Sequence, residues 1–175
     1  MRTTTKRAQG ILARLGLGVV ALSAAAAAVG ALTTTHVATV TRTTTASPEA
    51  IWNLWADVPN RTRWDTGLVW ARIDGPFQQG ATGEVRLKDQ PTRRFEIIDS
   101  RPPRRYTDRF FLPMGTSMDW HHSIDELGDN RRQVAFRVEV TGPTALILAP
   151  IAKSILGDEL PQTIDRLTTI AEGAR

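Results

Sequence analysis

The segment SPEAIWNLWADVPNRTRWD, residues 47–65, describes a short helix that is capped at its start and rich in tryptophan. Ser47 is a favourable N-cap, and Pro48 suits the first helical position because its missing N–H would be unpaired there anyway. Apolar residues recur at spacings of three and four, so they share one face of the helix. They are Ile51, Leu54, Trp55 and Val58. A second short turn is expected over residues 60–64.

Strand-like segments lie on both sides of this helix. Residues 33–45, rich in threonine and valine, read as a first strand. Turn-forming Gly, Pro, Asp and Asn residues separate six further segments, which indicates an antiparallel meander. The six predicted strands cover residues 68–74, 82–88, 94–100, 105–112, 116–127 and 133–141.

Alternation along the later strands predicts which side chains point inward. Phe95 and Ile97 share one face of an earlier strand, whereas adjacent Phe110 and Phe111 leave the register of residues 106–111 open. The inward sets on the last two strands are Met118, Trp120, His122 and Ile124, followed by Val134, Phe136, Val138 and Val140.

Residues 144–172 are predicted to form a long helix after the sheet. The later half carries an amphipathic stripe, which needs an apolar surface to cover it. The concave face of the sheet is the available surface. Kinks or a break are expected near Pro150 and Pro161, since proline disturbs a helix interior. The stripe consists of Leu160, Ile164, Leu167 and Ala171.

The first 32 residues look like a targeting segment. Four basic residues precede a charge-free, alanine-rich stretch over residues 15–32, which is typical of a secretory signal or a membrane anchor. At 1.5 Å per residue this stretch would extend about 27 Å as a helix, against a hydrocarbon core of roughly 30 Å. We therefore expect residues 1–32 to be a signal peptide or anchor and residues 33–175 to be one domain, secreted or membrane-anchored outside the cytoplasm.

The charge balance and the absence of cysteine exclude several kinds of site. The chain has 22 Lys and Arg against 18 Asp and Glu, and the excess of four lies within residues 1–31. The remainder is neutral, so the high isoelectric point does not indicate nucleic-acid binding. With no cysteine, disulfides and thiolate metal sites are excluded. No metal or cofactor is expected.

The element order, with ASPEAIWNLWADVPNRTRWD (residues 46–65), GPFQQGATG (75–83) and LPQTIDRLTTIAEG (160–173), resembles the SRPBCC superfamily. This superfamily includes START lipid-transfer domains, Bet v 1-like proteins and the polyketide cyclase/dehydrase group. The resemblance covers residues 36–172. It implies an α+β helix-grip fold, in which a curved antiparallel sheet of about seven strands wraps around the long C-terminal helix, with two short helices after the first strand.

The resemblance also implies an apolar cavity between the sheet and the C-terminal helix, suited to a lipid, sterol or polyketide-like molecule. Large aromatic side chains on inward faces agree with this, although tryptophans such as Trp52 and Trp55 also serve as plain packing. The expected ligand contacts are Trp120, Met118, Phe95, Phe110, Phe136, Arg109 and Trp55.

Polyketide cyclases of this fold need polar groups inside an apolar pocket. His122 is the candidate acid or base, because it is expected to point inward and imidazole exchanges protons near neutral pH. Tyr106 and Arg109 or Arg94 would orient a carbonyl, and Asp108 would orient the histidine. His121 and His122 do not form a metal motif, because neighbours on a strand face opposite sides.

Three functions stay open at this point. The chain is a non-enzymatic carrier or sensor of a hydrophobic ligand, exported or held at the membrane by its N-terminal segment. Alternatively, it is a cyclase, aromatase or dehydratase that acts on a polyketide-like substrate. The third alternative is an interaction module with a solid interior. Fold alone does not decide among them.

Overall fold

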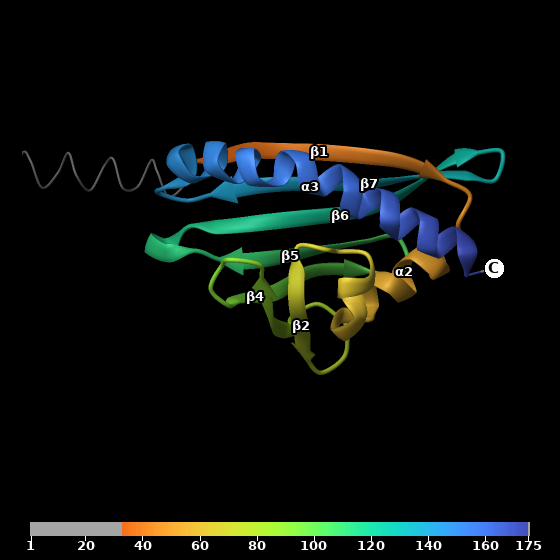
Figure 1. Ribbon diagram of the computed structural model, residues 1–175, viewed down its shortest axis with the longest axis horizontal. Coiled ribbons are helices and arrows are strands. Elements are labelled where there is room, and N and C mark those ends of the chain that lie inside the picture. Colours follow the sequence, from red (N-terminus) through yellow and green to blue (C-terminus); the bar gives the residue numbers. More distant parts are fainter. Residues whose placement is uncertain (1–32, 175) are drawn as a thin grey trace, which may run out of the picture.

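The computed structural model describes residues 33–174, and these fold around one curved sheet (Figure 1). The elements follow the chain order that the sequence predicts. They are β1 (Thr34–Thr44), α2 (Pro48–Ala56), the 3₁₀ turn η1 (Val58–Arg63), β2 (Leu68–Asp74), β3 (Thr82–Leu87), β4 (Arg93–Arg101), β5 (Arg105–Phe111), the 3₁₀ turn η2 (Pro113–Gly115), β6 (Ser117–Gly128), β7 (Arg131–Thr141) and α3 (Ala145–Gly173).

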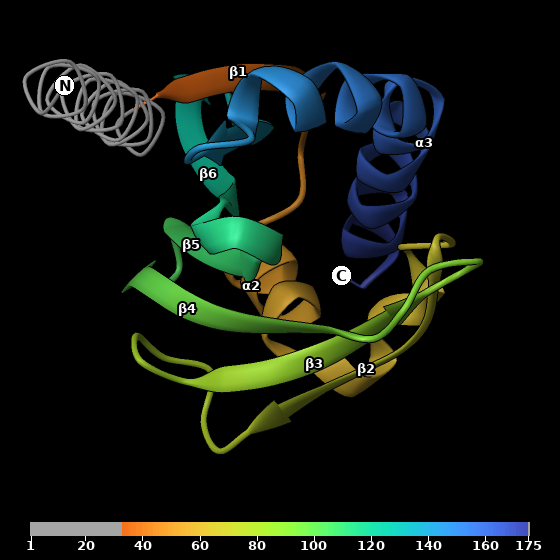
Figure 2. The same cartoon turned by 90° about the vertical axis from the view of Figure 1, so that its left-hand side faces the viewer.

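The sheet has seven strands in the order β1-β7-β6-β5-β4-β3-β2. Every neighbouring pair is antiparallel, so strands β2 to β7 form a meander and β1 closes it by pairing with β7. The sheet curves into a half-pipe, and α3 packs against β1, β7 and α2 (Figure 2). The expected α+β helix-grip architecture is confirmed.

The helix start at residue 47 is built as the sequence predicts. The Ser47 side chain accepts a hydrogen bond from the backbone N–H of Ala50 at 3.1 Å, and Pro48 occupies the first turn. Ile51, Trp55 and Val58 on the predicted face are each 0% exposed. Helix α2 lies at the end of the half-pipe opposite the first turns of α3 (Figure 1).

Alternation also predicts the inner face of the last strands correctly. Val134, Phe136, Val138 and Val140 are all buried. On β5 the register left open by sequence is now visible, since Tyr106, Asp108 and Phe110 lie on the cavity side. Phe111 faces away and is 51% exposed.

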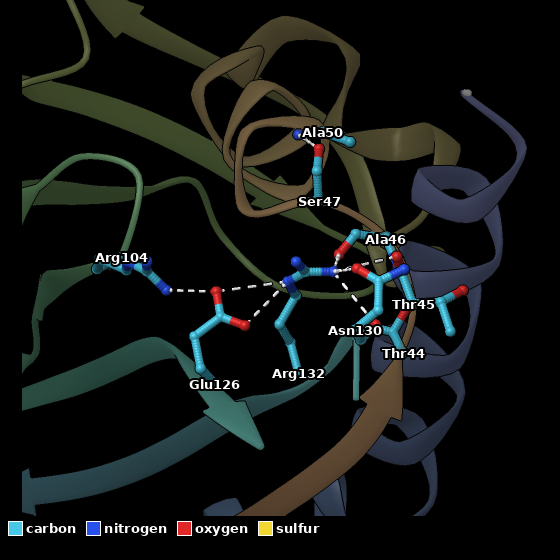
Figure 3. A network of polar contacts seen from close by, with 9 residues as sticks. All are labelled: Thr44, Thr45, Ala46, Ser47, Ala50, Arg104, Glu126, Asn130 and Arg132. Atoms are coloured by element: carbon cyan, nitrogen blue, oxygen red, sulfur yellow. Dashed lines mark hydrogen bonds and ion pairs between the residues drawn. The ribbon is translucent and has the colours of Figure 1, made fainter. Parts of the chain in front are cut away.

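A polar network ties the link between β1 and α2 to the β6–β7 hairpin (Figure 3). Arg132 donates to the backbone oxygens of Thr45 at 3.3 Å and Ala46 at 3.4 Å, and its guanidinium pairs with Glu126 at 3.2 Å. Arg104 pairs with the same carboxylate at 2.8 Å. These contacts fix the chain just before Ser47, and hence the direction in which α2 leaves the sheet.

The two prolines do not break the C-terminal helix. Helix α3 continues from residue 145 to residue 173 through Pro150 and Pro161. Each proline removes one backbone hydrogen bond, which bends a helix when the rest of the turn stays intact. Figure 2 shows the two halves of α3 running in different directions over the sheet. Of the two expected outcomes, a kink or a break, the structure shows a bend without a break.

The predicted leader over residues 1–32 lies outside the described residues. Within residues 33–174, no helix is both long and apolar enough to cross a membrane.

Gly83 lies where β3 meets β2 and β4, and a side chain there would collide with its neighbours. A Cβ would lie 2.3 Å from the Arg72 carbonyl oxygen and 2.5 Å from the Phe95 ring. We predict that Gly83→Ala lowers the free energy of unfolding by about 1–3 kcal/mol, as overpacking does.

The matched control is Gly157→Ala in α3, where a Cβ meets nothing within 4 Å. This change should stabilise the protein by up to about 1 kcal/mol, because alanine is the better helix former. Chemical denaturation of both variants measures the two effects. Equal stability of the two variants would contradict the close approach at Gly83.

Candidate functional site

A cavity of about 340 Å³ lies between the concave face of the sheet and α3. Paired residues on β5 and β6 line it in three successive layers. Phe110 opposite Met118 forms the layer next to η2, Asp108 opposite Trp120 the middle layer, and Tyr106 opposite His122 the innermost layer. Helix α3 covers the cavity with Leu148, Ile151, Ala152, Ile155, Leu156 and Thr163.

The centre of the polar part of the cavity is the guanidinium of Arg61, from η1. Its side chain is 6% exposed. Nε and Nη2 donate to the backbone oxygen of Trp55 at 3.1 and 3.0 Å, and Nη2 also donates to the Tyr106 hydroxyl at 3.2 Å. Nη1 lies 3.5 Å from Oδ2 of Asp108, whose side chain is 3% exposed. A buried charge of this kind persists only when it is paired and hydrogen-bonded.

Asp108 and His122 face each other beside this guanidinium. Oδ1 of Asp108 lies 3.8 Å from Nδ1 of His122. Both atoms are buried, and neither has a hydrogen-bond partner among the described residues. Nδ1 is thus the ring nitrogen of His122 that faces Asp108, and the imidazole itself lines the cavity.

Burial sets the protonation states of this cluster. It lowers the pKa of His122 well below its usual value, and the Arg61 charge lowers it further, so the imidazole is neutral at pH 7. Burial raises the pKa of Asp108 to about 6, with the Arg61 guanidinium opposing the shift. Burial also raises the pKa of Tyr106. A neutral imidazole and a neutral phenol thus lie beside an Arg–Asp ion pair.

Aromatic stacking fixes the imidazole in place. The rings of Tyr106 and His122 stack with centroids 4.1 Å apart and an interplanar angle of 4°. Phe136 meets the His122 ring edge-on at 4.6 Å, and Trp55 does so at 5.7 Å. The histidine is therefore held on three sides, and its orientation does not depend on a bound ligand.

The structure brings together seven of the ten residues that the sequence nominates for the site. His122, Tyr106, Asp108, Trp120, Met118, Phe110 and Phe136 all line the cavity. The other three lie elsewhere. Trp55 is 0% exposed beneath the cavity floor, Phe95 belongs to a second apolar cluster under β2 and β3, and Arg109 pairs with Asp119 on the convex face. The alternative to Arg109, Arg94, is exposed and does not line the cavity.

Sequence reasoning missed Arg61 and Asp65, which both line the cavity. Arg61 and Arg63 stand two residues apart in a polar turn, yet only Arg61 is buried. A side chain's direction within a 3₁₀ turn has no periodic signal in sequence, so nothing distinguishes the two arginines. The group that could orient a carbonyl is thus Arg61 and not Arg109 or Arg94. Within residues 33–174, no cluster of three or more His, Asp or Glu side chains is suited to a metal ion.

Residues 35–172 match the sequence model of the family described as polyketide cyclase/dehydrase and lipid transport. No curated protein matches the chain.

Solved structures share the fold at low sequence identity. A point mutant of norcoclaurine synthase from Thalictrum flavum, bound to a transition-state analogue, has a TM-score of 0.64 at 12% identity, covering 81% of this chain and 96% of that one. The di-domain ARO/CYC StfQ of the steffimycin biosynthetic pathway has a TM-score of 0.66 at 8% identity, covering 81% of this chain and 51% of that one. A START superfamily protein from Mycobacterium smegmatis has a TM-score of 0.63 at 15% identity, covering 81% and 100%. At these identities the likeness concerns the fold.

Asp65 provides a test of the site's electrostatics. Burial and the nearby Glu159 carboxylate raise the pKa of Asp65 from 3.8 to about 6. The hydrogen bond that Asp65 accepts from the backbone N–H of Gly67 opposes this shift. The folded state thus binds the proton more tightly than the unfolded state, and this group's contribution to stability is lost as the pH rises from about 4 to 6.

We predict that Asp65→Asn has little effect on stability at pH 4 and adds about 1–3 kcal/mol at pH 7. Urea denaturation across this pH range measures the difference from the parent chain. The exposed Asp158→Asn serves as the control and should show no such trend. A parallel rise in both variants would show that general charge, and not burial of Asp65, is responsible.

Proposed function

We propose that this chain, which belongs to the polyketide cyclase/dehydrase and lipid transport family, binds a hydrophobic small molecule in the cavity between its sheet and α3. The observation that carries the proposal is the cavity itself. Its walls are mainly apolar, and its innermost layers hold a cluster of polar groups around Arg61. Pockets for small molecules have this composition, with a few placed polar groups that fix the ligand's orientation.

Size and polarity narrow the class of ligand. A volume of about 340 Å³ is near the lower end of the usual range of about 300–1,000 Å³ for ligand pockets. The ligand is therefore compact, such as a fused-ring or short acyl molecule. Its leading end carries a hydroxyl or carbonyl group, because an apolar end would leave Arg61, Tyr106 and His122 without the hydrogen bonds that water otherwise supplies.

An interaction module with a solid interior is less well supported. Trp120 and Met118 are only partly buried although they point toward α3. A chain selected for packing alone would fill the volume between these side chains and the helix, since voids weaken a core.

Export or membrane tethering belongs to the same proposal. It rests on the four basic residues and the charge-free stretch over residues 15–32, a pattern typical of targeting segments. A binding domain placed outside the cytoplasm would meet its ligand in the envelope or at the membrane surface. The mass of the mature protein tells whether residues 1–32 are removed.

An enzymatic role is the second candidate, and a specific observation favours it. Asp108 faces Nδ1 of His122 at 3.8 Å, so a proton on Nδ1 leaves Nε2 free to accept a proton from a ligand. Arg61 and the Tyr106 hydroxyl lie beside it and would stabilise negative charge on a carbonyl oxygen. This arrangement suits removal of a proton next to a carbonyl, the first step of an aldol-type cyclisation or of a dehydration.

Filling the cavity tests the binding function. Ala152 lines the cavity from α3, so Ala152→Phe places a ring where the ligand would lie. We predict that it weakens binding of the neutral probe 1-N-phenylnaphthylamine by about tenfold or more, equivalent to about 1.4 kcal/mol. Probe fluorescence and quenching of the intrinsic tryptophan emission measure the binding.

The control for this experiment is Thr169→Phe, at an exposed position of the same helix. It adds a comparable ring outside the cavity and should bind the probe as the parent chain does. Equal affinity of all three proteins would mean that the probe binds elsewhere and would count against the proposal.

Replacing the histidine separates the two candidate functions. We predict that His122→Gln keeps probe binding within a few-fold, because the aromatic walls remain. If the chain is a cyclase, the same variant loses roughly 10²–10⁴-fold in the rate at which a short poly-β-ketone thioester cyclises. An unchanged rate, or a parent chain no faster than buffer, would reject the enzymatic role and leave the binding function standing.

A further inference from the structure

The mouth of the cavity carries exposed apolar side chains that the fold leaves uncovered. We call this set the rim. Ile151 and Ile155 line the cavity from α3 and are nevertheless 52% and 48% exposed. The other members are more exposed still. The rim consists of Met114 (76% exposed), Leu146 (72%), Ile147 (68%), Ile151 and Ile155.

These side chains belong to one end of the molecule. Ile147, Ile151 and Ile155 follow one another at spacings of four, so they form a single stripe along the first half of α3. Met114 directly follows Pro113, which lines the cavity from η2. Figure 2 looks at this end, where the first half of α3 lies above the turn that joins β5 to β6, with β4 below. The stripe and η2 therefore border the same opening.

The backbone at Met114 is held in an unusual conformation. Its φ is +61° and that of Gly115 is +71°, in the left-handed region that costs a non-glycine residue energy. The turn thus exposes the large apolar side chain of Met114 to solvent, and no packing in the interior compensates for this. Such an arrangement is common where a surface serves binding.

Basic side chains flank the rim. Lys88 and Arg93 bracket the β3–β4 turn, with Arg93 reaching the cavity wall, and Lys153 lies on α3 between Ile151 and Ile155. None of these three cations forms an ion pair with another residue in the part of the chain that the structure describes. The β3–β4 turn itself holds one carboxylate, Asp89. Exposed apolar side chains with basic side chains beside them suit an interface that is apolar inside and anionic at its surface.

The chain enters the domain at this same end. Strand β1 begins at Thr34. The carbonyl of Thr33 accepts a hydrogen bond from the N–H of Gly142, which stands three residues before the start of α3. Residues 1–32, with their charge-free stretch, are thus joined to the domain beside the rim. If residues 1–32 bind a bilayer, the domain would face the bilayer with the mouth of its cavity.

We propose that the rim docks onto a lipid bilayer that contains anionic lipids, so that the cavity opens toward the membrane. Ile147, Ile151 and Met114 enter the headgroup region while Lys88, Arg93 and Lys153 pair with lipid phosphates. A second copy of the chain fits the rim less well, because a stable dimer interface needs about 20–30 residues on each side. The inference goes beyond ligand binding and does not depend on which molecule fills the cavity.

A fluorescent label reports docking directly, because the chain contains no cysteine. The full chain carrying Ile147→Cys is labelled with a nitrobenzoxadiazole dye and mixed with vesicles of phosphatidylcholine, with or without phosphatidylglycerol. We expect a blue shift and a rise in intensity with the anionic vesicles. Replacing Lys88 and Lys153 by Gln should weaken this response by roughly fivefold for each charge removed.

The matched control carries the same dye at Arg137→Cys, an exposed position on the convex face. It shares residues 1–32 with the rim variant, so attachment through those residues alone gives both labels the same response. Equal responses, no response of the rim label to either vesicle, or a shift that depends on protein concentration without vesicles would each overturn the proposal. Probe binding measured on the labelled chains shows independently whether the cavity still takes a ligand.

Discussion

The guanidinium of Arg61 is the group on which the candidate site depends. It ties the end of α2, through the Trp55 carbonyl, to the Tyr106 hydroxyl and the Asp108 carboxylate on β5. A charge with 6% exposure costs several kcal/mol unless all its partners are in place. The tryptophan-rich helix and the middle of the sheet are therefore held at one separation. That separation creates the inner end of the cavity. It also places the Arg61 charge close enough to His122 to lower the pKa of the imidazole.

The cavity arises because α3 covers only part of the concave face of the sheet. The curved sheet presents mainly apolar side chains on its concave face, but among the described elements α3 packs mainly on β1, β7 and α2. The remaining strands keep their inward residues, such as Phe110 and Trp120, facing an unfilled volume. The inner end carries the polar cluster around Arg61, and the mouth carries exposed apolar side chains with Arg93 beside them. A ligand that enters thus exchanges water contacts first for apolar walls and then for directed hydrogen bonds.

Much of the fold was predictable because its signals are local. Ser47 and Pro48 mark a helix start, and the alternation from Val134 to Val140 marks a strand with one buried face. A helix over residues 144–172 was predictable, but whether Pro150 and Pro161 would kink it or break it was not, because tertiary packing decides whether the helix continues across a missing hydrogen bond. The burial of Arg61 and not of Arg63 was not predictable either, since both stand in one short turn. Only the neighbouring carboxylate and carbonyl decide which of the two is buried. Tyr106, Asp108 and His122 on strands were therefore found, and Arg61 on the turn was missed.

The central claim is that a hydrophobic molecule lies in this cavity with its polar end at Arg61. A crystal structure of the protein with 1-naphthol, a compact aromatic molecule with one hydroxyl, tests it most directly. The account predicts electron density between Trp120 and the first half of α3, with the hydroxyl within hydrogen-bonding distance of His122, Tyr106 or Arg61. Density confined to the outer surface, or side chains from α3 that collapse to fill the volume, would contradict it.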